Sequence, residues 1–144
     1  MVIEKVSEVT EEIVKSVAKL IPQLGVQKAP PTWDELNLLV HSEASTLLIA
    51  RYPDEMGEIV GILSLTIYRV PTGIRSIVED VVVDENMRRR GIAEAMMLRA
   101  IDLAKEAGAN GVALTSNPRR EAANKLYQSM GFQQRETNAY FYKF

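Results

Sequence analysis

The chain of 144 residues is long enough for one domain with a buried core, and its 47% hydrophobic content is typical of a soluble globular protein. A formal net charge of −2 disfavours a general nucleic-acid binder, and the absence of cysteine excludes disulfides, thiolate metal sites and a cysteine nucleophile. No apolar run reaches the roughly 20 residues that cross a bilayer, and residues 1–12 are too polar for a signal peptide, so we expect one cytoplasmic domain over residues 1–144.

The first predicted elements are a short strand and an amphipathic helix. Residues 2–6 show the polar and apolar alternation of an edge strand. A helix begins at Thr10, because the apolar residues that follow it recur at helical spacing. Pro22 and Gly25 end this helix.

A loop over residues 23–31 leads to a second predicted helix. Thr32 and Glu35 have the T-x-x-E spacing of a capping box, in which each side chain bonds a backbone N–H group at the start of a helix. His41 lies in the same helix. Because it is the only histidine of the chain, we expect it to have a packing or surface role and we assign no metal.

Three strands are predicted next. Residues 46–51, 59–70 and 74–83 are rich in β-branched and other apolar side chains, and turn residues at 53–57 and 71–73 separate them. The pattern therefore predicts consecutive strands joined by short connections.

The segment from Val81 to Ala93 combines a strand end, a basic turn and the start of a helix. The strand ends in three valines, which predicts burial on both faces and so a central strand. Arg88, Arg89 and Arg90 precede Gly91, and a strongly amphipathic helix follows. Unpaired N–H groups and the helix dipole attract anions, and glycine lets a phosphate approach the backbone. The segment predicts a phosphate site, with a solvated basic cap as the alternative.

This helix ends at Gly108, and a strand follows over residues 111–115. Strand, helix and strand from Val78 to Thr115 form a βαβ unit with parallel strands and a right-handed crossover. The basic turn lies at the carboxyl end of its first strand, where ligands of open α/β sheets collect. Met96 and Met97 have the spacing of core residues.

A fourth helix is predicted from Asn117 and Pro118, a good N-cap and first helical residue. Capping is the favoured role of Asn117. Arg120, Asn124 and Tyr127 fall at i, i+4 and i+7 and share one stripe of this helix. A polar stripe is usually solvated, and composition alone gives it no further role.

Two motifs of the chain resemble the GNAT superfamily of acyl-CoA-dependent N-acyltransferases. One is Gln or Arg, two residues, Gly, one residue, and Gly or Ala, which matches Arg88, Gly91 and Ala93. The other is a later Tyr, three residues, Gly and Phe, which matches Tyr127, Gly131 and Phe132 and follows Asn117 and Asn124. The resemblance covers residues 74–132 with specific motifs and the N-terminal third only by the order of its elements.

The resemblance implies an α/β fold with a mixed sheet of about six or seven strands and helices on both faces. Residues 133–135 and 139–143 would supply a final hairpin. It also implies acetyl-CoA as cosubstrate, whose pantetheine arm would face the stripe of the last helix. The residues expected to bind it are Val81, Val82, Val83, Arg88, Arg89, Arg90, Gly91, Ile92, Ala93, Asn117, Arg120, Asn124 and Tyr127.

Acyl transfer to an amine needs a base, an acid and stabilisation of an oxyanion. Glu79 is the candidate base, because alternation places it on the face of Val81 and Val83 and points Asp80 to the other face, and because the polyamine acetyltransferase branch has a matching glutamate. An ion pair of Glu79 with Arg75 or Arg135 is an equal alternative. The resemblance makes Tyr127 the candidate acid, since a phenol stays neutral near pH 7, and packing of its aromatic ring on the sheet is the alternative. Backbone N–H groups of residues 81–83 would hold the oxyanion.

The expected activity is transfer of acetyl from acetyl-CoA to an amine, which is a small amine, an amino acid or a protein amine. A non-catalytic acyl-CoA-binding sensor is the rival, against which intact Glu79 and Tyr127 speak. A nucleic-acid-binding module built on Arg88 to Arg90 and Arg119 to Arg120 is disfavoured by the negative net charge. We expect no membrane partner. The resemblance is compatible with a homodimer, but no particular residue of the sequence indicates one.

Overall fold

The computed structural model describes residues 1–25 and 29–144, so residues 26–28 of the predicted loop lie outside the described residues. The strands are β1 (Val2–Lys5), β2 (Ser45–Tyr52), β3 (Glu58–Val70) and β4 (Gly73–Val83). The helices are α1 (Glu11–Leu20), α2 (Trp33–His41), α3 (Ile92–Glu106) and α4 (Glu121–Ser129), with 3₁₀ helices η1 (Ile21–Leu24) and η2 (Glu85–Met87). The predicted elements up to Glu106 are confirmed within a few residues.

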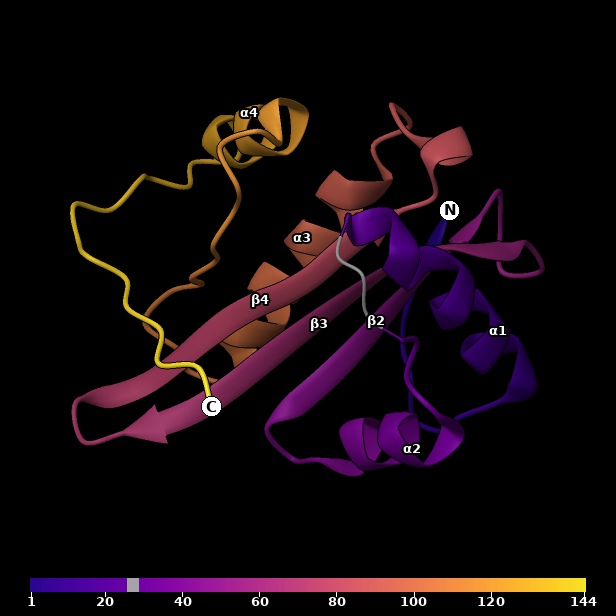
Figure 1. The fold of residues 1–144 in the computed structure, drawn as a ribbon, viewed down its shortest axis with the longest axis horizontal. Coiled ribbons are helices and arrows are strands. Elements are labelled where there is room, and N and C mark those ends of the chain that lie inside the picture. Colours follow the sequence, from indigo (N-terminus) through magenta and orange to yellow (C-terminus); the bar gives the residue numbers. More distant parts are fainter. Residues whose placement is uncertain (26–28) are drawn as a thin grey trace.

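The four strands form one antiparallel sheet in the order β1-β2-β3-β4 (Figure 1). The prediction of six or seven strands is wrong for the described residues. The segment expected as a parallel strand at 111–115 makes one parallel bridge, between Ala113 and Ile77. Its direction is as predicted, but it is too short to count as a strand.

The predicted final hairpin at 133–135 and 139–143 is also absent, and this part of the chain is an extended coil (Figure 1). Its aromatic side chains Tyr140, Tyr142 and Phe144 are exposed to solvent. A hairpin register is fixed by a buried face, and here no face is buried.

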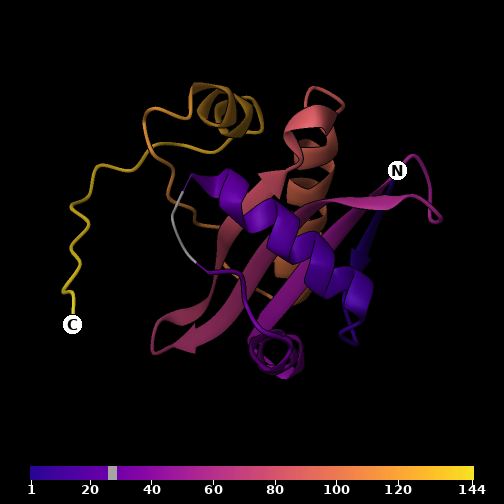
Figure 2. The same ribbon diagram turned by 45° about the vertical axis from the view of Figure 1, so that its right-hand side comes forward.

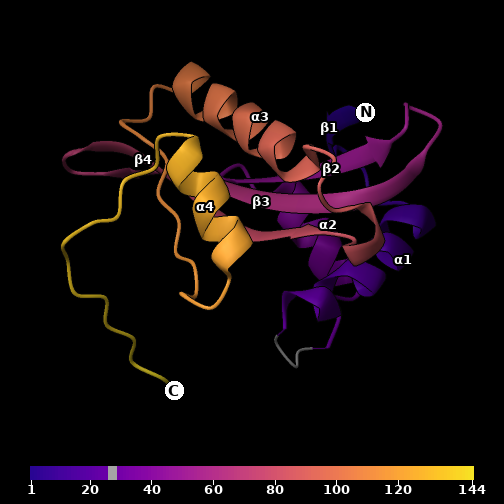
Figure 3. The same ribbon diagram turned by 90° about the horizontal axis from the view of Figure 1, so that it is seen from above.

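Helices cover both faces of the sheet, as predicted. Seen from above, α3 lies on one side of the strands and α1 and α2 lie on the other (Figure 3). The turned view shows α1 crossing one face while α3 runs behind the sheet (Figure 2).

The core has two parts, one on each face. Leu63, Leu65, Met96 and Met97 are fully buried between the sheet and α3, in a cluster that also contains Tyr127 of α4. The methionines are therefore core residues, as predicted. On the other face, Leu20 and a second set of aliphatic side chains pack between α1, α2 and the strands.

Helices α1 and α2 each begin directly after a threonine that caps them. The Thr10 hydroxyl accepts a hydrogen bond from the Ile13 N–H group, and the Thr32 hydroxyl accepts one from the Glu35 N–H group. The return bond of a capping box, from the Thr32 N–H group to the Glu35 carboxylate, is not formed, so the box is only half built. Within residues 1–25 and 29–144, none of the helices combines the length and the apolar character that a bilayer crossing requires.

Candidate functional site

A β-bulge in β4 sets the geometry of the site. Ile62 pairs with Val82 and Ser64 pairs with Glu79, so the single residue Leu63 faces two residues of β4, Asp80 and Val81. Asp80 has a φ of 50°, in the left-handed region that aspartate tolerates better than most residues. The bulge shifts the alternation of side chains by one residue.

This shift overturns the predicted placement of Glu79. Directly opposed residues of an antiparallel pair share a face, so Glu79 lies on the face of Ser64, toward α1 and α2. Val81 and Val83 pack on the α3 face instead. The prediction that Asp80 points away from the face of Glu79 is wrong too, because Asp80 lines the same pocket as Ser64.

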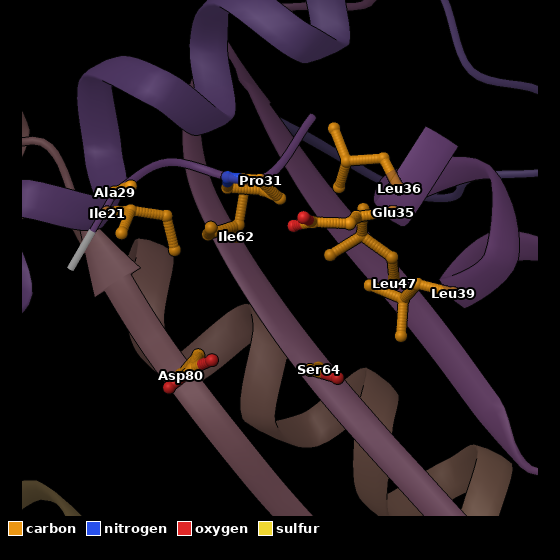
Figure 4. A pocket seen from close by; sticks show the side chains of 10 residues that line it. All are labelled: Ile21, Ala29, Pro31, Glu35, Leu36, Leu39, Leu47, Ile62, Ser64 and Asp80. Atoms are coloured by element: carbon orange, nitrogen blue, oxygen red, sulfur yellow. The ribbon is translucent and has the colours of Figure 1, made fainter. Parts of the chain in front are cut away.

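That pocket lies over β2, β3 and β4 on the face covered by α1 and α2, and has a volume of about 280 Å³ (Figure 4). Its walls are largely apolar and include Ile21, Pro31, Leu36, Leu39, Leu47 and Ile62. Its polar groups are the carboxylates of Glu35 and Asp80 and the hydroxyl of Ser64. No described residue that lines it is a lysine or an arginine. An apolar pocket with a few polar groups suits a small organic molecule, and the carboxylates favour a cation.

The basic turn and the start of α3 have the geometry of an anion site. Gly91 is the N-cap of α3 with a φ of 74°, and a Cβ atom added there would meet nothing within 4 Å. The first hydrogen bond of the helix runs from the Ala95 N–H group to the Gly91 carbonyl, which leaves the N–H groups before Ala95 without helical acceptors. A phosphate group can therefore approach this backbone closely.

The three arginines of the turn are exposed. Arg89 has a φ of 63°, a left-handed conformation that is unfavourable for arginine. The guanidinium carbon of Arg90 lies 5.4 Å from the centre of the Tyr52 ring, a cation–π contact that directs this side chain back over β2. Arg88 and Arg89 thus stand at the turn with Gly91, while Arg90 is also held by the sheet.

β4 lies at the edge of the sheet, so the prediction of a central strand is wrong for the described residues, and the outer edge of β4 is open after Val78. The Val78 N–H group donates to the Ala113 carbonyl at 2.9 Å, and beyond this point no described backbone group bonds that edge. The guanidinium of Arg120 comes within 3.5 Å of the Val81 carbonyl, at the limit of a hydrogen bond. An extended polar molecule that lies beside β4 could form hydrogen bonds with these unpaired backbone groups, since an open strand edge pairs with extended molecules.

Asn117 does not cap the last helix, because α4 begins at Glu121 with Arg120 as its N-cap. The predicted N-cap role of Asn117 is therefore wrong. Its side-chain oxygen accepts a hydrogen bond from the Arg119 N–H group, and its carbonyl accepts one from Arg120. The amino group of Asn124 donates to the carbonyls of Asn117 and Arg120, both at 2.9 Å. These bonds join the turn at 117–120 to the helix.

Tyr127 is 7% exposed and packs edge to face on Phe132, with ring centres 5.9 Å apart. It belongs to the core cluster that contains Val81, so its ring lies on the α3 side of the sheet. Burial raises the pKa of the Tyr127 hydroxyl, and the nearby positive charge of Arg120 opposes this shift. The phenol therefore keeps its proton at neutral pH.

The structure brings together part of the predicted site. The end of β4, the start of α3 and the stripe of α4 meet on the α3 side, where Tyr127 packs with Val81 and Arg120 reaches the same strand. Glu79 lies on the opposite face. Its alternative role has no support, because neither Arg75 nor Arg135 forms an ion pair with it among the described residues.

Sequence reasoning missed Glu35 and Asp80 as pocket residues. The T-x-x-E pattern accounts for Glu35 by a place in a capping box, and strict alternation puts Asp80 on the wrong face. The T-x-x-E spacing gives no sign that the glutamate side chain turns away from the helix start. An Asp next to a Glu in a strand could have suggested a bulge, but only the pairing with β3 reveals it.

The residues of the turn fit a phosphate-bearing cosubstrate such as a coenzyme A thioester. The open space at Gly91 and the free N–H groups after it would receive the pyrophosphate, with Arg88 and Arg89 beside it. The open edge of β4 would receive the pantetheine arm of such a thioester.

Comparison with known proteins finds relatives for most of the chain. The model of the acetyltransferase (GNAT) family matches residues 15–132. N-acetyltransferase family 8 member 3 of Rattus norvegicus is 34% identical over 93 residues, which are 63% of this chain and 40% of the rat protein. The chain thus spans less than half the length of that curated relative.

Solved structures share the fold at lower identity. An acetyltransferase of Trypanosoma brucei superposes with a TM-score of 0.77 at 23% identity, covering 98% of both chains. An aminoglycoside acetyltransferase from an uncultured soil metagenomic sample has a TM-score of 0.83 at 19% identity, covering 99% of this chain and 94% of that one.

Proposed function

Because the chain belongs to the acetyltransferase (GNAT) family, we propose that it transfers an acetyl group from acetyl-CoA to an amine. The single observation that carries this proposal is the start of α3, where a left-handed glycine with open space at its Cβ position follows directly on the basic turn. The name of the rat relative, an N-acetyltransferase, supports nitrogen as the acceptor atom.

The proposed binding residues for acetyl-CoA are those of the anion site and the open edge. Gly91, Ile92 and Ala93 would offer backbone to the pyrophosphate, and Arg88 to Arg90 would offer positive charge. Residues 81–83 would pair with the pantetheine arm through backbone groups. Asn117 and Arg120 would border it from the turn before α4, and Asn124 would border it from α4. When bound, acetyl-CoA supplies an activated acyl group and a thiolate leaving group.

Glu79 is the proposed base and Tyr127 the proposed acid. The two lie on opposite faces of the sheet, Glu79 on the face of Ser64 and Tyr127 on the α3 side, and would approach the open edge of β4 from these two sides. Glu79 would accept one proton from the ammonium group of the acceptor, directly or through a water molecule. The neutral nitrogen would then attack the thioester carbon, and the carbon–sulfur bond would break as the amide bond forms. Solvent would take the second nitrogen proton and restore the proton that Tyr127 gives up. Tyr127 would share its proton with the departing sulfur, for which a phenol held neutral by burial is suited. Backbone N–H groups of residues 81–83 would face the oxygen on which negative charge develops.

The test is an assay of the purified chain with acetyl-CoA and a panel of small amines, amino acids and peptide amines. Release of free CoA thiol is followed by its reaction with a thiol reagent, and mass spectrometry identifies the acetylated product. We expect amine-dependent thiol release and an acetylated amine of the panel. Tight acetyl-CoA binding without turnover on any amine would instead identify the chain as an acyl-CoA sensor.

A further inference from the structure

The pocket on the α1 and α2 face carries a charge pattern that the proposed function does not use. Asp80 enters it from the bulge of β4, and Glu35 enters it from the first turn of α2 (Figure 4). The two carboxylates come from different elements, with β3 and its residues Ile62 and Ser64 lying between β4 and the α2 side.

We propose that the acceptor is a small aliphatic amine with two cationic groups, one held at Asp80 and the other at Glu35. The inference rests on the proposed acetyl transfer and names the substrate class of that site. Hydrocarbon walls between two carboxylates match a molecule with an alkyl chain between two ammonium groups.

The apolar walls of the pocket favour a hydrocarbon chain between the two charged groups of the acceptor. Leu36, Leu47 and Ile62 are almost fully buried and face the pocket from α2, β2 and β3. They offer no hydrogen bond, so a sugar or a peptide would leave its polar groups unpaired against them. A methylene chain gains from the contact instead.

The volume limits the size of the acceptor. The volume of about 280 Å³ lies at the lower end of the range for small-molecule sites. A linear diamine of a few methylene groups enters such a pocket whole, whereas a large polycation inserts only one end.

The position of Asp80 suits it to the reacting end of the acceptor. It is the neighbour of Glu79, the proposed base, and of Val81, whose carbonyl lies at the open edge of β4. Its left-handed φ of 50° belongs to the bulge that lets it face the pocket. Asp80 is thus a residue that orients the acceptor, and Glu35 is the residue that distinguishes a diamine from a monoamine.

Glu35 also stabilises the start of α2, and the experiment must separate this structural role from binding of the acceptor. A carboxylate in the first turn of a helix stabilises the helix through the dipole. Asp34 is the matched control, because it lies in the same turn of α2 and does not line the pocket. Glu35→Gln and Asp34→Asn therefore make similar changes to the helix, and only the first changes the pocket.

The experiment compares 1,4-diaminobutane with n-butylamine, which has the same chain and one charge. In the wild type we expect kcat/KM for the diamine to exceed that for the monoamine by about tenfold, the effect of one hydrogen bond to a charged group. Glu35→Gln should abolish this preference through a higher KM, and Asp34→Asn should keep it. Equal activity on the two amines, or equal loss in the two variants, overturns the proposal.

Calorimetry without acetyl-CoA separates this proposal from the proposed function. If no amine is acetylated but 1,4-diaminobutane binds the wild type and Asp34→Asn more tightly than Glu35→Gln, the pocket assignment stands and the transfer activity fails. If amines are acetylated while the diamine binds all three chains alike, the pocket assignment fails and the activity stands.

Discussion

The ammonium nitrogen of Lys19 lies 2.6 Å from a carboxylate oxygen of Asp84, joining the end of α1 to the residue after β4. The Asp84 side chain is 4% exposed and also accepts a hydrogen bond from the Asn86 N–H group. Nearby, the side-chain oxygen of Gln23 accepts a hydrogen bond from the Glu85 N–H group. The segment that contributes Ile21 to the pocket over β2, β3 and β4 is thus attached to the turn that leads to the anion site.

This attachment should make stability depend on pH. The hydrogen bonds from Lys19 and from Asn86 lower the pKa of Asp84. A lowered folded-state pKa contributes stability above the ordinary aspartate pKa of about 3.9, and the contribution is lost as pH falls through the lowered value. Asp84→Asn should therefore melt at a lower temperature than the wild type at pH 7, and the difference between the two melting temperatures should shrink as pH falls below the ordinary aspartate pKa and through the lowered one.

Thermal melts followed by circular dichroism between pH 2.5 and pH 8 measure this. The bond to Asp84 raises the pKa of Lys19, so its contribution persists up to the ordinary lysine pKa and is lost only as pH rises through the raised value. Asp54→Asn, in an exposed turn, is the control and should follow the wild type. A constant difference between Asp84→Asn and wild type over the whole acid range contradicts the prediction.

Gly91→Asp should weaken acetyl-CoA binding at least tenfold, because a side chain and a negative charge would occupy the space for the pyrophosphate. Gly108→Asp is the matched control, since its φ of 80° imposes similar strain at the other end of α3. Titration calorimetry should show weaker binding only for Gly91→Asp. Equal affinities in the two variants would remove the anion site from the start of α3.

Tyr127→Phe should lower turnover by about 10² to 10⁴, the usual contribution of general acid catalysis. The ring stays, so its packing on Phe132 and the melting temperature should hardly change. Tyr140→Phe, at an exposed tyrosine, should have parental activity. Steady-state kinetics and a thermal melt decide: parental turnover in Tyr127→Phe means that another group protonates the thiolate.

Glu79→Gln should lower turnover and flatten the acidic limb of the pH–rate profile while acetyl-CoA affinity stays near parental. Asp80→Asn should instead raise KM for the amine, because Asp80 orients the acceptor. Initial rates over a range of pH and amine concentration distinguish the two effects. If Asp80→Asn abolishes turnover and Glu79→Gln retains it, the base is Asp80.

Gly61→Val should destabilise the contact between β3 and α3. A Cβ atom at Gly61 would lie 2.9 Å from the terminal carbon of Met96 and 3.4 Å from a methyl group of Ile92. Overpacking of this kind costs about 1–3 kcal/mol. Gly111→Val, where a Cβ atom meets nothing within 4 Å, is the control, and chemical denaturation compares the two. Equal free energies of unfolding for Gly61→Val and Gly111→Val would show that α3 moves to accommodate the larger side chain without a loss of stability.

Local pattern alone determined the elements that carry the anion site. The three valines, the arginines and Gly91 predict a buried strand end, a basic turn and a helix start, and each follows from neighbours within a few residues. The caps at Thr10 and Thr32 were predictable for the same reason.

Tertiary structure alone decided which face of the sheet each carboxylate occupies. Strict alternation puts Glu79 with Val81, and the extra residue opposite Leu63 separates them. A bulge is a property of two paired strands, so the sequence of β4 does not contain it. The pocket likewise depends on α2 packing over β2, which turns Glu35 from a capping residue into the partner of Asp80. Residues brought together from distant positions leave no periodic pattern, because their spacing is set by the packing of elements and not by the geometry of any one of them.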